Sequence, residues 1–181
     1  MENQIYGLSA AAWLFPLLFF SISLIWAHSQ KKEKKFFGKI PTLSGGQLLL
    51  IAQTLALLLL AGILLDWLAF FFQVNDTTAV VATATLLSSI PLTAIVFLVV
   101  SALAEEMFFR GVLFNEIGKW PSIFLFAFAH GGYFSIIQII GAFAAGYILF
   151  RARERAASIF PGFVAHALYN LAVVFILIQI A

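Results

Sequence analysis

Six apolar stretches, separated by short polar or basic connections, make up most of the chain. They cover about residues 8–27, 47–72, 90–114, 122–130, 134–150 and 157–181. A hydrocarbon core about 30 Å thick is crossed by about 20 apolar residues in a helix, and the alternating pattern of a transmembrane barrel is missing. We therefore predict an all-α fold, a polytopic transmembrane bundle of about six helices.

Composition excludes an ordinary soluble domain. Of the 181 residues, 63% are hydrophobic and 10% are charged, and the mean hydropathy is +1.05. Soluble domains are about half apolar and about a quarter charged. Cysteine is absent, which excludes disulfides, thiol nucleophiles and thiolate metal ligands.

The basic residues predict a topology. A lysine-rich segment at 31–39 follows the first apolar stretch, the reverse of a signal peptide, so we expect a retained anchor. Placing this segment in the cytoplasm puts the N-terminus outside. The remaining basic residues then all fall on the cytoplasmic side: Arg110, Lys119, Arg151, Arg153 and Arg155. We expect these charges to meet the lipid bilayer and no nucleic acid, in an integral multi-pass protein of a bacterial or archaeal cell membrane.

We divide the chain into two parts of a single integrated membrane domain. Residues 1–89 hold N-terminal transmembrane helices and the basic cytoplasmic loop. Residues 90–181 hold the expected catalytic core, because the acid–base residues inside the apolar stretches, Glu105, Glu106, His130 and His166, all lie there.

Glu105, Glu106, His130 and His166 lie inside apolar stretches. A charged side chain deep in a bilayer costs about 3 kcal/mol, so such residues are functional candidates. The helical rise places each of them about 13–15 Å below the cytoplasmic face. Three helices are thus expected to bring acid–base groups to one depth, in a cavity open toward the cytoplasm.

Helical spacing separates the roles of the two glutamates. Glu106 and Arg110 are four residues apart and are expected to pair on one face of their helix. Glu105 lies about 100° round that helix from Glu106 and has no local partner, which makes it the candidate general base. We expect His130 to be its partner.

The last apolar stretch carries a second spacing of four, between His166 and Asn170. Their imidazole and carboxamide groups project from one helix face, and both can donate hydrogen bonds. Two fixed donors in a water-poor cavity suit a developing oxyanion, for which one donor contributes about 3 kcal/mol.

Three short motifs occur in one order along the chain: EExxxR at 105–110, FxxxH at 126–130 and HxxxN at 166–170. In these motifs the chain resembles the CPBP family. That family comprises CAAX prenyl proteases of the glutamate type, bacteriocin-processing proteins and self-immunity membrane proteins. The resemblance extends over about residues 90–175.

The resemblance implies hydrolysis of a peptide bond by a glutamate-activated water. Glu105 and His130 align with the water-activating pair of the family, and His166 and Asn170 with its oxyanion-stabilising pair. Structural support is implied for the remaining motif positions, Glu106, Arg110 and Phe126. The expected substrate is a membrane-associated protein or peptide, cleaved in a C-terminal CAAX-like or sorting tail or at a leader junction. The prenyl-protein proteases generally have more helices before the motif core, so sorting and leader peptides are equally open.

Three other interpretations stay open. Glu105, His130 and His166 would supply a zinc site of the His₂Glu type, although the HExxH motif is missing and we expect no cofactor. A non-catalytic immunity or scaffold protein would keep the fold and bind a partner peptide in the cavity. A proton-coupled transporter has suitable residues but no internal repeat. The oligomeric state is left open.

Overall fold

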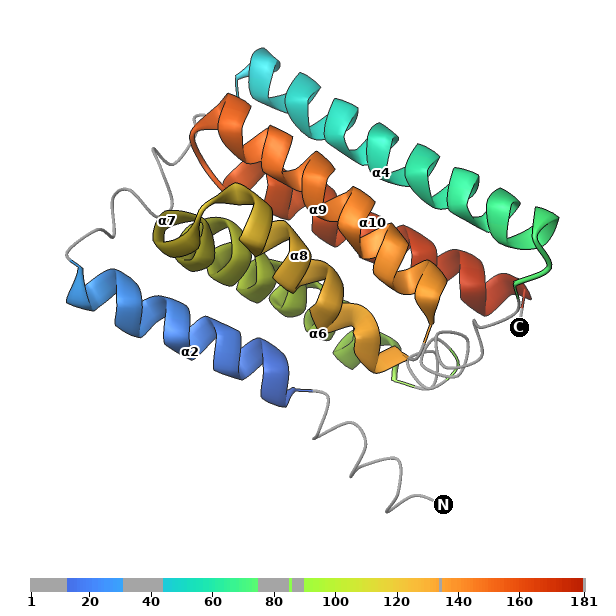
Figure 1. Ribbon diagram of the computed structural model, residues 1–181, viewed down its shortest axis with the longest axis horizontal. Helices are drawn as coiled ribbons and strands as arrows, with labels where there is room; N and C mark the ends of the chain where they lie inside the picture. Colours follow the sequence, from blue (N-terminus) through green and yellow to red (C-terminus); the bar gives the residue numbers. More distant parts are fainter. Residues whose placement is uncertain (1–12, 31–43, 75–84, 86–89, 134, 181) are drawn as a thin grey trace.

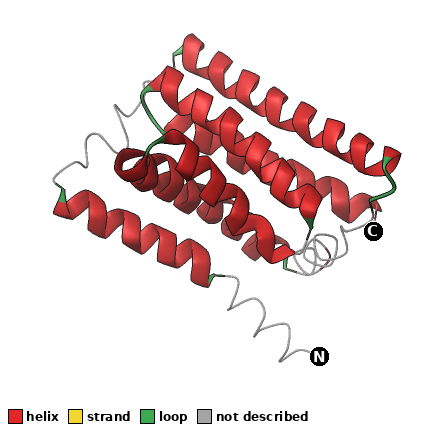
Figure 2. Cartoon of the chain, viewed as in Figure 1, coloured by secondary structure: helices red, strands yellow, loops and turns green. Residues whose placement is uncertain are grey.

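The described part of the chain is built from helices alone. The computed structural model describes residues 13–30, 44–74, 85, 90–133 and 135–180, and no strand occurs among them (Figures 1 and 2). The helices are α2 (Leu14–Ser29), α4 (Gly45–Phe71), α6 (Pro91–Glu105), the π-helix η1 (Glu106–Leu113), α7 (Phe114–Ile117), α8 (Lys119–Ala129), the 3₁₀-helix η2 (His130–Tyr133), α9 (Ile136–Ala156) and α10 (Phe160–Ile180). The predicted all-α class is confirmed.

Four of the described helical segments are long and apolar enough to cross a membrane: Gly45–Phe71, the continuous run Pro91–Ile117, Ile136–Ala156 and Phe160–Leu177. The helix Leu14–Ser29 is apolar but shorter. Large apolar side chains face outward, as at Ile63 and Phe70, which are 66% and 84% exposed. Hydrocarbon, unlike water, solvates such a surface favourably. The chain is an integral, multi-pass membrane protein.

Two helices flank a central group on opposite sides (Figure 1). The central group consists of α6 with η1, α8, α9 and α10. Helix α2 packs against α6 and η1, and α4 packs against α9 and α10. Stacked aromatic rings hold α2 in place, because Phe19 lies parallel to Phe108 with ring centroids 4.6 Å apart. The candidate site residues all belong to the central group.

Two predicted boundaries are wrong. The turn expected at 115–121 is confined to Gly118, whose φ of +83° suits glycine, and Pro121 lies in the first turn of α8. Proline is tolerated there because a first-turn N–H has no intrahelical acceptor. The arginines expected after the helix at 134–150 instead lie within α9, which continues to Ala156. Cations in the last turns of a helix are favoured by its dipole.

One end of the bundle gathers the interfacial side chains. The Trp26 indole Nε1–H donates to Glu116 Oε1 over 2.8 Å, which ties α2 to α7. At the same end Glu154 pairs with both Lys119 and Arg151, each at 3.1 Å. Lys119 and Arg151, two of the basic residues that we assigned to the cytoplasmic side, therefore lie at this end, whereas Arg110 is completely buried. The lysine-rich segment and the connection near residue 76 lie outside the described residues.

Cysteine labelling tests the orientation of this bundle. The chain has no cysteine, so Phe36→Cys and Asp76→Cys each introduce a single reactive thiol. We expect a membrane-impermeant maleimide to label position 36 only from the cytoplasmic side and position 76 only from the outside, as the distribution of basic residues requires. The opposite pattern would contradict the predicted topology.

Candidate active site

The first motif lies where the membrane helix changes its winding. Helix α6 ends at Glu105, and the π-helix η1 begins at Glu106 and continues to Leu113. A regular α-helix was expected throughout this stretch, so the expectation is wrong at this point. The π-helix is rare and concentrates at functional sites. Because each π turn holds an additional residue, the change of winding sets the directions of the side chains around Glu105 and Glu106.

Side-chain donors stabilise η1 from two positions. The Ser122 hydroxyl of α8 donates to the carbonyl of Phe109, and the Asn115 side-chain amide donates to the carbonyl of Gly111. Ser122 is fully buried. The Phe109 carbonyl also accepts the N–H of Phe114, so it carries two bonds. We did not predict this role for Ser122, and its only signal in the sequence is a hydroxyl inside an apolar stretch.

Replacing Ser122 by alanine is expected to lower the free energy of unfolding by about 1 kcal/mol, because a buried hydrogen bond is lost. Ser101 is the matched control, since its hydroxyl is also buried but has no hydrogen-bond partner among the described residues. Ser101→Ala should leave stability unchanged or raise it slightly. Unfolding of both variants in the same detergent micelles measures the difference, and equal effects would contradict a specific role of Ser122 in supporting η1.

Glu106 and Arg110 form the expected ion pair. Arg110 Nη1 lies 3.1 Å from Glu106 Oε1, and both side chains are completely buried. The guanidinium lies 4.0 Å from the ring centroid of Phe126, in cation–π contact. Gly146 makes room for this stack, because a Cβ there would approach Phe126 Cδ1 to 3.2 Å. The pair and its aromatic neighbour thus form a close-packed, buried support.

His166 bridges the two glutamates. Its Nδ1 lies 3.1 Å from Glu106 Oε1, and its Nε2 lies 3.8 Å from Glu105 Oε2. A carboxylate only accepts hydrogen bonds, so Nδ1–H donates to Glu106 and the ring is held with Nε2 toward Glu105. Gly162, on the same helix as His166, leaves space for the second oxygen of Glu106, which would lie 3.2 Å from a Cβ at that position.

Glu105 differs from Glu106 in exposure and in partners. The Glu105 side chain is 20% exposed, whereas that of Glu106 is fully buried. Glu105 Oε2 has no hydrogen-bond partner among the described residues. Glu106 Oε1 pairs with Arg110 and with His166, whereas no ion pair joins Glu105 to Arg110 among the described residues; Oε2 of Glu106, like Oε2 of Glu105, has no hydrogen-bond partner there. Of the two carboxylates, Glu105 is therefore the more exposed and the one outside the ion pair with Arg110.

His130 lies at the edge of the same cluster. Its Nδ1–H donates to the carbonyl of Phe126 over 2.9 Å, since a carbonyl oxygen only accepts. In the neutral ring Nε2 is therefore a proton acceptor. The ring centroid of Phe126 lies 4.7 Å from that of His130 and 6.1 Å from that of His166, so both imidazoles lie beside Phe126.

The structure brings together most, but not all, of the residues expected in the site. Glu105 contacts His166, and no ion pair joins it to His130 within the described structure. Asn170 lies one turn beyond His166 on α10 and makes no hydrogen bond with another described residue. Among the described residues, no group of three or more His, Cys, Asp or Glu side chains is arranged to hold a metal ion. The contact between His166 and Glu106 was not predicted.

Comparison with protein families agrees with the motifs. Residues 87–172 are similar to the family described as Type II CAAX prenyl endopeptidase Rce1-like. The expected resemblance to the CPBP family is thereby confirmed, and the matched segment contains all three motifs. Comparison with curated proteins and with solved structures gives no match.

Proposed function

We propose that this chain is an intramembrane endopeptidase that hydrolyses a peptide bond with a water activated by Glu105. The observation that carries the proposal is the unequal pair of adjacent glutamates. Glu106 is fully buried in an ion pair with Arg110, whereas Glu105 lies outside that pair, is 20% exposed and has Oε2 3.8 Å from His166 Nε2. A general base needs both a free lone pair and access to substrate.

In the proposed reaction, a water between Glu105 and His130 attacks the scissile carbonyl carbon. Glu105 takes one proton of the water. Nε2 of His130 accepts a hydrogen bond from the other hydrogen of the water and so orients the water. The bond between the carbonyl carbon and the amide nitrogen then breaks. The proton held by Glu105 passes to the departing amine, so that the carboxylate is restored.

His166 and Asn170 are proposed to stabilise the oxyanion. Because His166 Nδ1–H is already donated to Glu106, Nε2 becomes a donor only when the ring is protonated. Asn170, one turn further along α10, supplies the second donor through its amide.

The proposed substrate is a membrane-associated peptide or protein, cut near a C-terminal CAAX-like or sorting tail or at a leader junction. The family match over residues 87–172 supports this class. The basic residues gathered at one end of the bundle support a cavity that opens toward the cytoplasm.

Proteolysis in reconstituted bilayers tests the proposal. The wild-type chain is mixed with farnesylated CAAX peptides, sorting-tail peptides and leader peptides, and the fragments are identified by mass spectrometry. Cleavage that survives a strong chelator and is lost in His166→Ala supports the proposed chemistry. Cleavage that stops with the chelator and returns with zinc would instead support a metalloprotease.

A further inference from the structure

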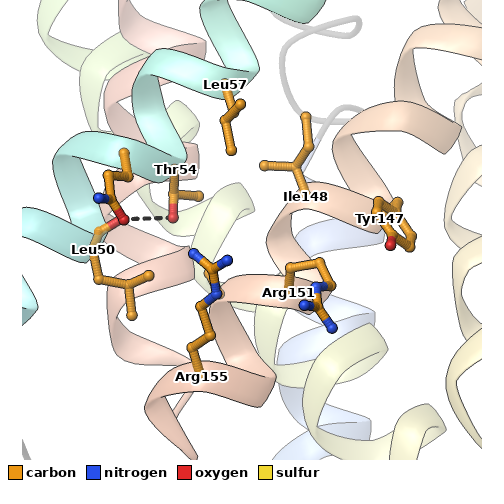
Figure 3. A pocket seen from close by; sticks show the side chains of 9 residues that line it. Leu50, Thr54, Leu57, Tyr147, Ile148, Arg151 and Arg155 are labelled. Carbon is orange, nitrogen blue, oxygen red and sulfur yellow. Dashed lines mark hydrogen bonds between the residues drawn. The ribbon is translucent and has the colours of Figure 1, made fainter.

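A groove separate from the active site runs between α4 and α9 (Figure 3). Its volume is about 290 Å³, which is close to the lower end of ligand pockets, about 300 Å³. Its apolar walls include Leu50 and Leu57 from α4 and Ile148 from α9. Two arginines of α9, Arg151 and Arg155, also line the groove, together with Gln53, Thr54, Tyr147 and Ala152.

The groove lies on the opposite side of α9 from the catalytic cluster. Gly146 of α9 faces Phe126 and Arg110, since a Cβ at this glycine would meet both side chains. The neighbouring Tyr147 and Ile148 line the groove. Occupation of the groove therefore does not require contact with Glu105 or His166.

The two ends of the groove differ in polarity. Arg151 and Arg155 lie in the last turns of α9, at the end of the bundle where Lys119 and Glu154 also meet. Figure 3 shows the two arginines at one end of the groove and Leu57 toward the other. From Leu50 to Leu57 the α4 wall extends about 10 Å along the helix axis, and Gln53 and Thr54 lie between the two leucines. The groove therefore runs in the direction of a lipid chain, with its cationic end at the membrane surface.

The cationic end has charge available for a ligand. Arg155 is exposed and has no ion pair among the described residues. Arg151 is half exposed and shares its charge with Glu154 at 3.1 Å. Basic side chains at the membrane surface attract anionic lipid headgroups. An apolar groove at membrane depth is filled by hydrocarbon, because contact of apolar side chains with water is less favourable than contact with hydrocarbon.

We propose that this groove binds one anionic phospholipid from the leaflet that contains Arg151 and Arg155. The headgroup phosphate pairs with the two guanidinium groups, and one acyl chain lies along Leu50, Leu57 and Ile148. The charge at one end and the apolar wall at the other match the two parts of such a lipid.

Lipid retention tests this binding site. The protein is reconstituted into bilayers of phosphatidylcholine and phosphatidylglycerol, extracted into mild detergent, and examined by native mass spectrometry. We expect the wild-type protein to retain phosphatidylglycerol in preference to phosphatidylcholine. The double variant Arg151→Gln/Arg155→Gln should lower that preference about tenfold, since two partly available charges are lost. A wild-type protein that retains the two lipids in their bulk ratio would overturn the proposal.

A second pair of variants tests the apolar wall without altering charge. Leu57→Trp should fill the groove and reduce the retention of phosphatidylglycerol. Leu60→Trp is the matched control, because Leu60 is exposed to a similar extent, 52% against 49% for Leu57, but does not line the groove. Equal loss in both variants, or no loss in Leu57→Trp, would contradict the proposed site. If a farnesylated peptide displaces the lipid and depends on the same residues, the groove is a substrate site and the proposal is wrong.

Discussion

Glu105→Gln is expected to reduce peptide cleavage by about 10³-fold, because a glutamine cannot accept the proton of the attacking water. The exchange keeps the size of the side chain, and the residue lies outside the buried ion pair. The free energy of unfolding should therefore change little. Cleavage rates in bilayers and unfolding in detergent, measured on the same preparation, separate the two effects.

The adjacent glutamate supplies the informative comparison. Glu106→Gln removes the charge that balances Arg110 and weakens the bond to His166, so both stability and cleavage should fall. Glu116→Gln, at the exposed end of the bundle, is the control that should leave cleavage unchanged. If Glu105→Gln cleaves at the wild-type rate while Glu106→Gln remains folded but inactive, the assignment of the general base is wrong.

Arg110→Met is expected to lower the free energy of unfolding by about 3–5 kcal/mol, because it leaves the fully buried carboxylate of Glu106 without its cation. His166 remains as a hydrogen-bond partner and favours the lower end of this range. Unfolding by denaturant in detergent micelles measures the change.

A second substitution separates the loss of charge from the loss of packing. The double variant Glu106→Gln/Arg110→Met removes both charges, so it should be more stable than Arg110→Met alone. The contrary result is a fall in the free energy of unfolding of the double variant equal to the sum of the decreases in Glu106→Gln and Arg110→Met. In that case the destabilisation comes from the lost contact between Arg110 and Phe126 and not from an unpaired charge.

Features set by neighbouring residues could be predicted from the sequence. The apolar stretches predicted the membrane helices, because the thickness of a bilayer fixes the length that a span requires. The pair of Glu106 and Arg110 was predictable because side chains four residues apart in a helix lie on one face. The end of α9 was missed because a run of arginines resembles a connection, although it also suits a helix C-terminus.

Features set by packing between helices could not be predicted. The bridge between His166 and Glu106 joins side chains 60 residues apart and depends on how α10 lies against η1. The change to a π-helix at Glu106 is accompanied by a bond from Ser122 of another helix, which no local pattern reveals. As a result, the expected partner of Glu105 was His130, whereas the contact in the structure is with His166.

The most direct test of the account is proteolysis of membrane peptides by the wild-type chain and by the double variant Glu105→Ala/His130→Ala in the same bilayers, with fragments identified by mass spectrometry. The account predicts a defined pair of fragments from the wild-type chain and none from the double variant, although the variant still folds and binds the peptide. Peptide binding that persists in both proteins, with no cleavage of any candidate by the wild-type chain, would contradict the account and favour a binding protein with the fold of a protease.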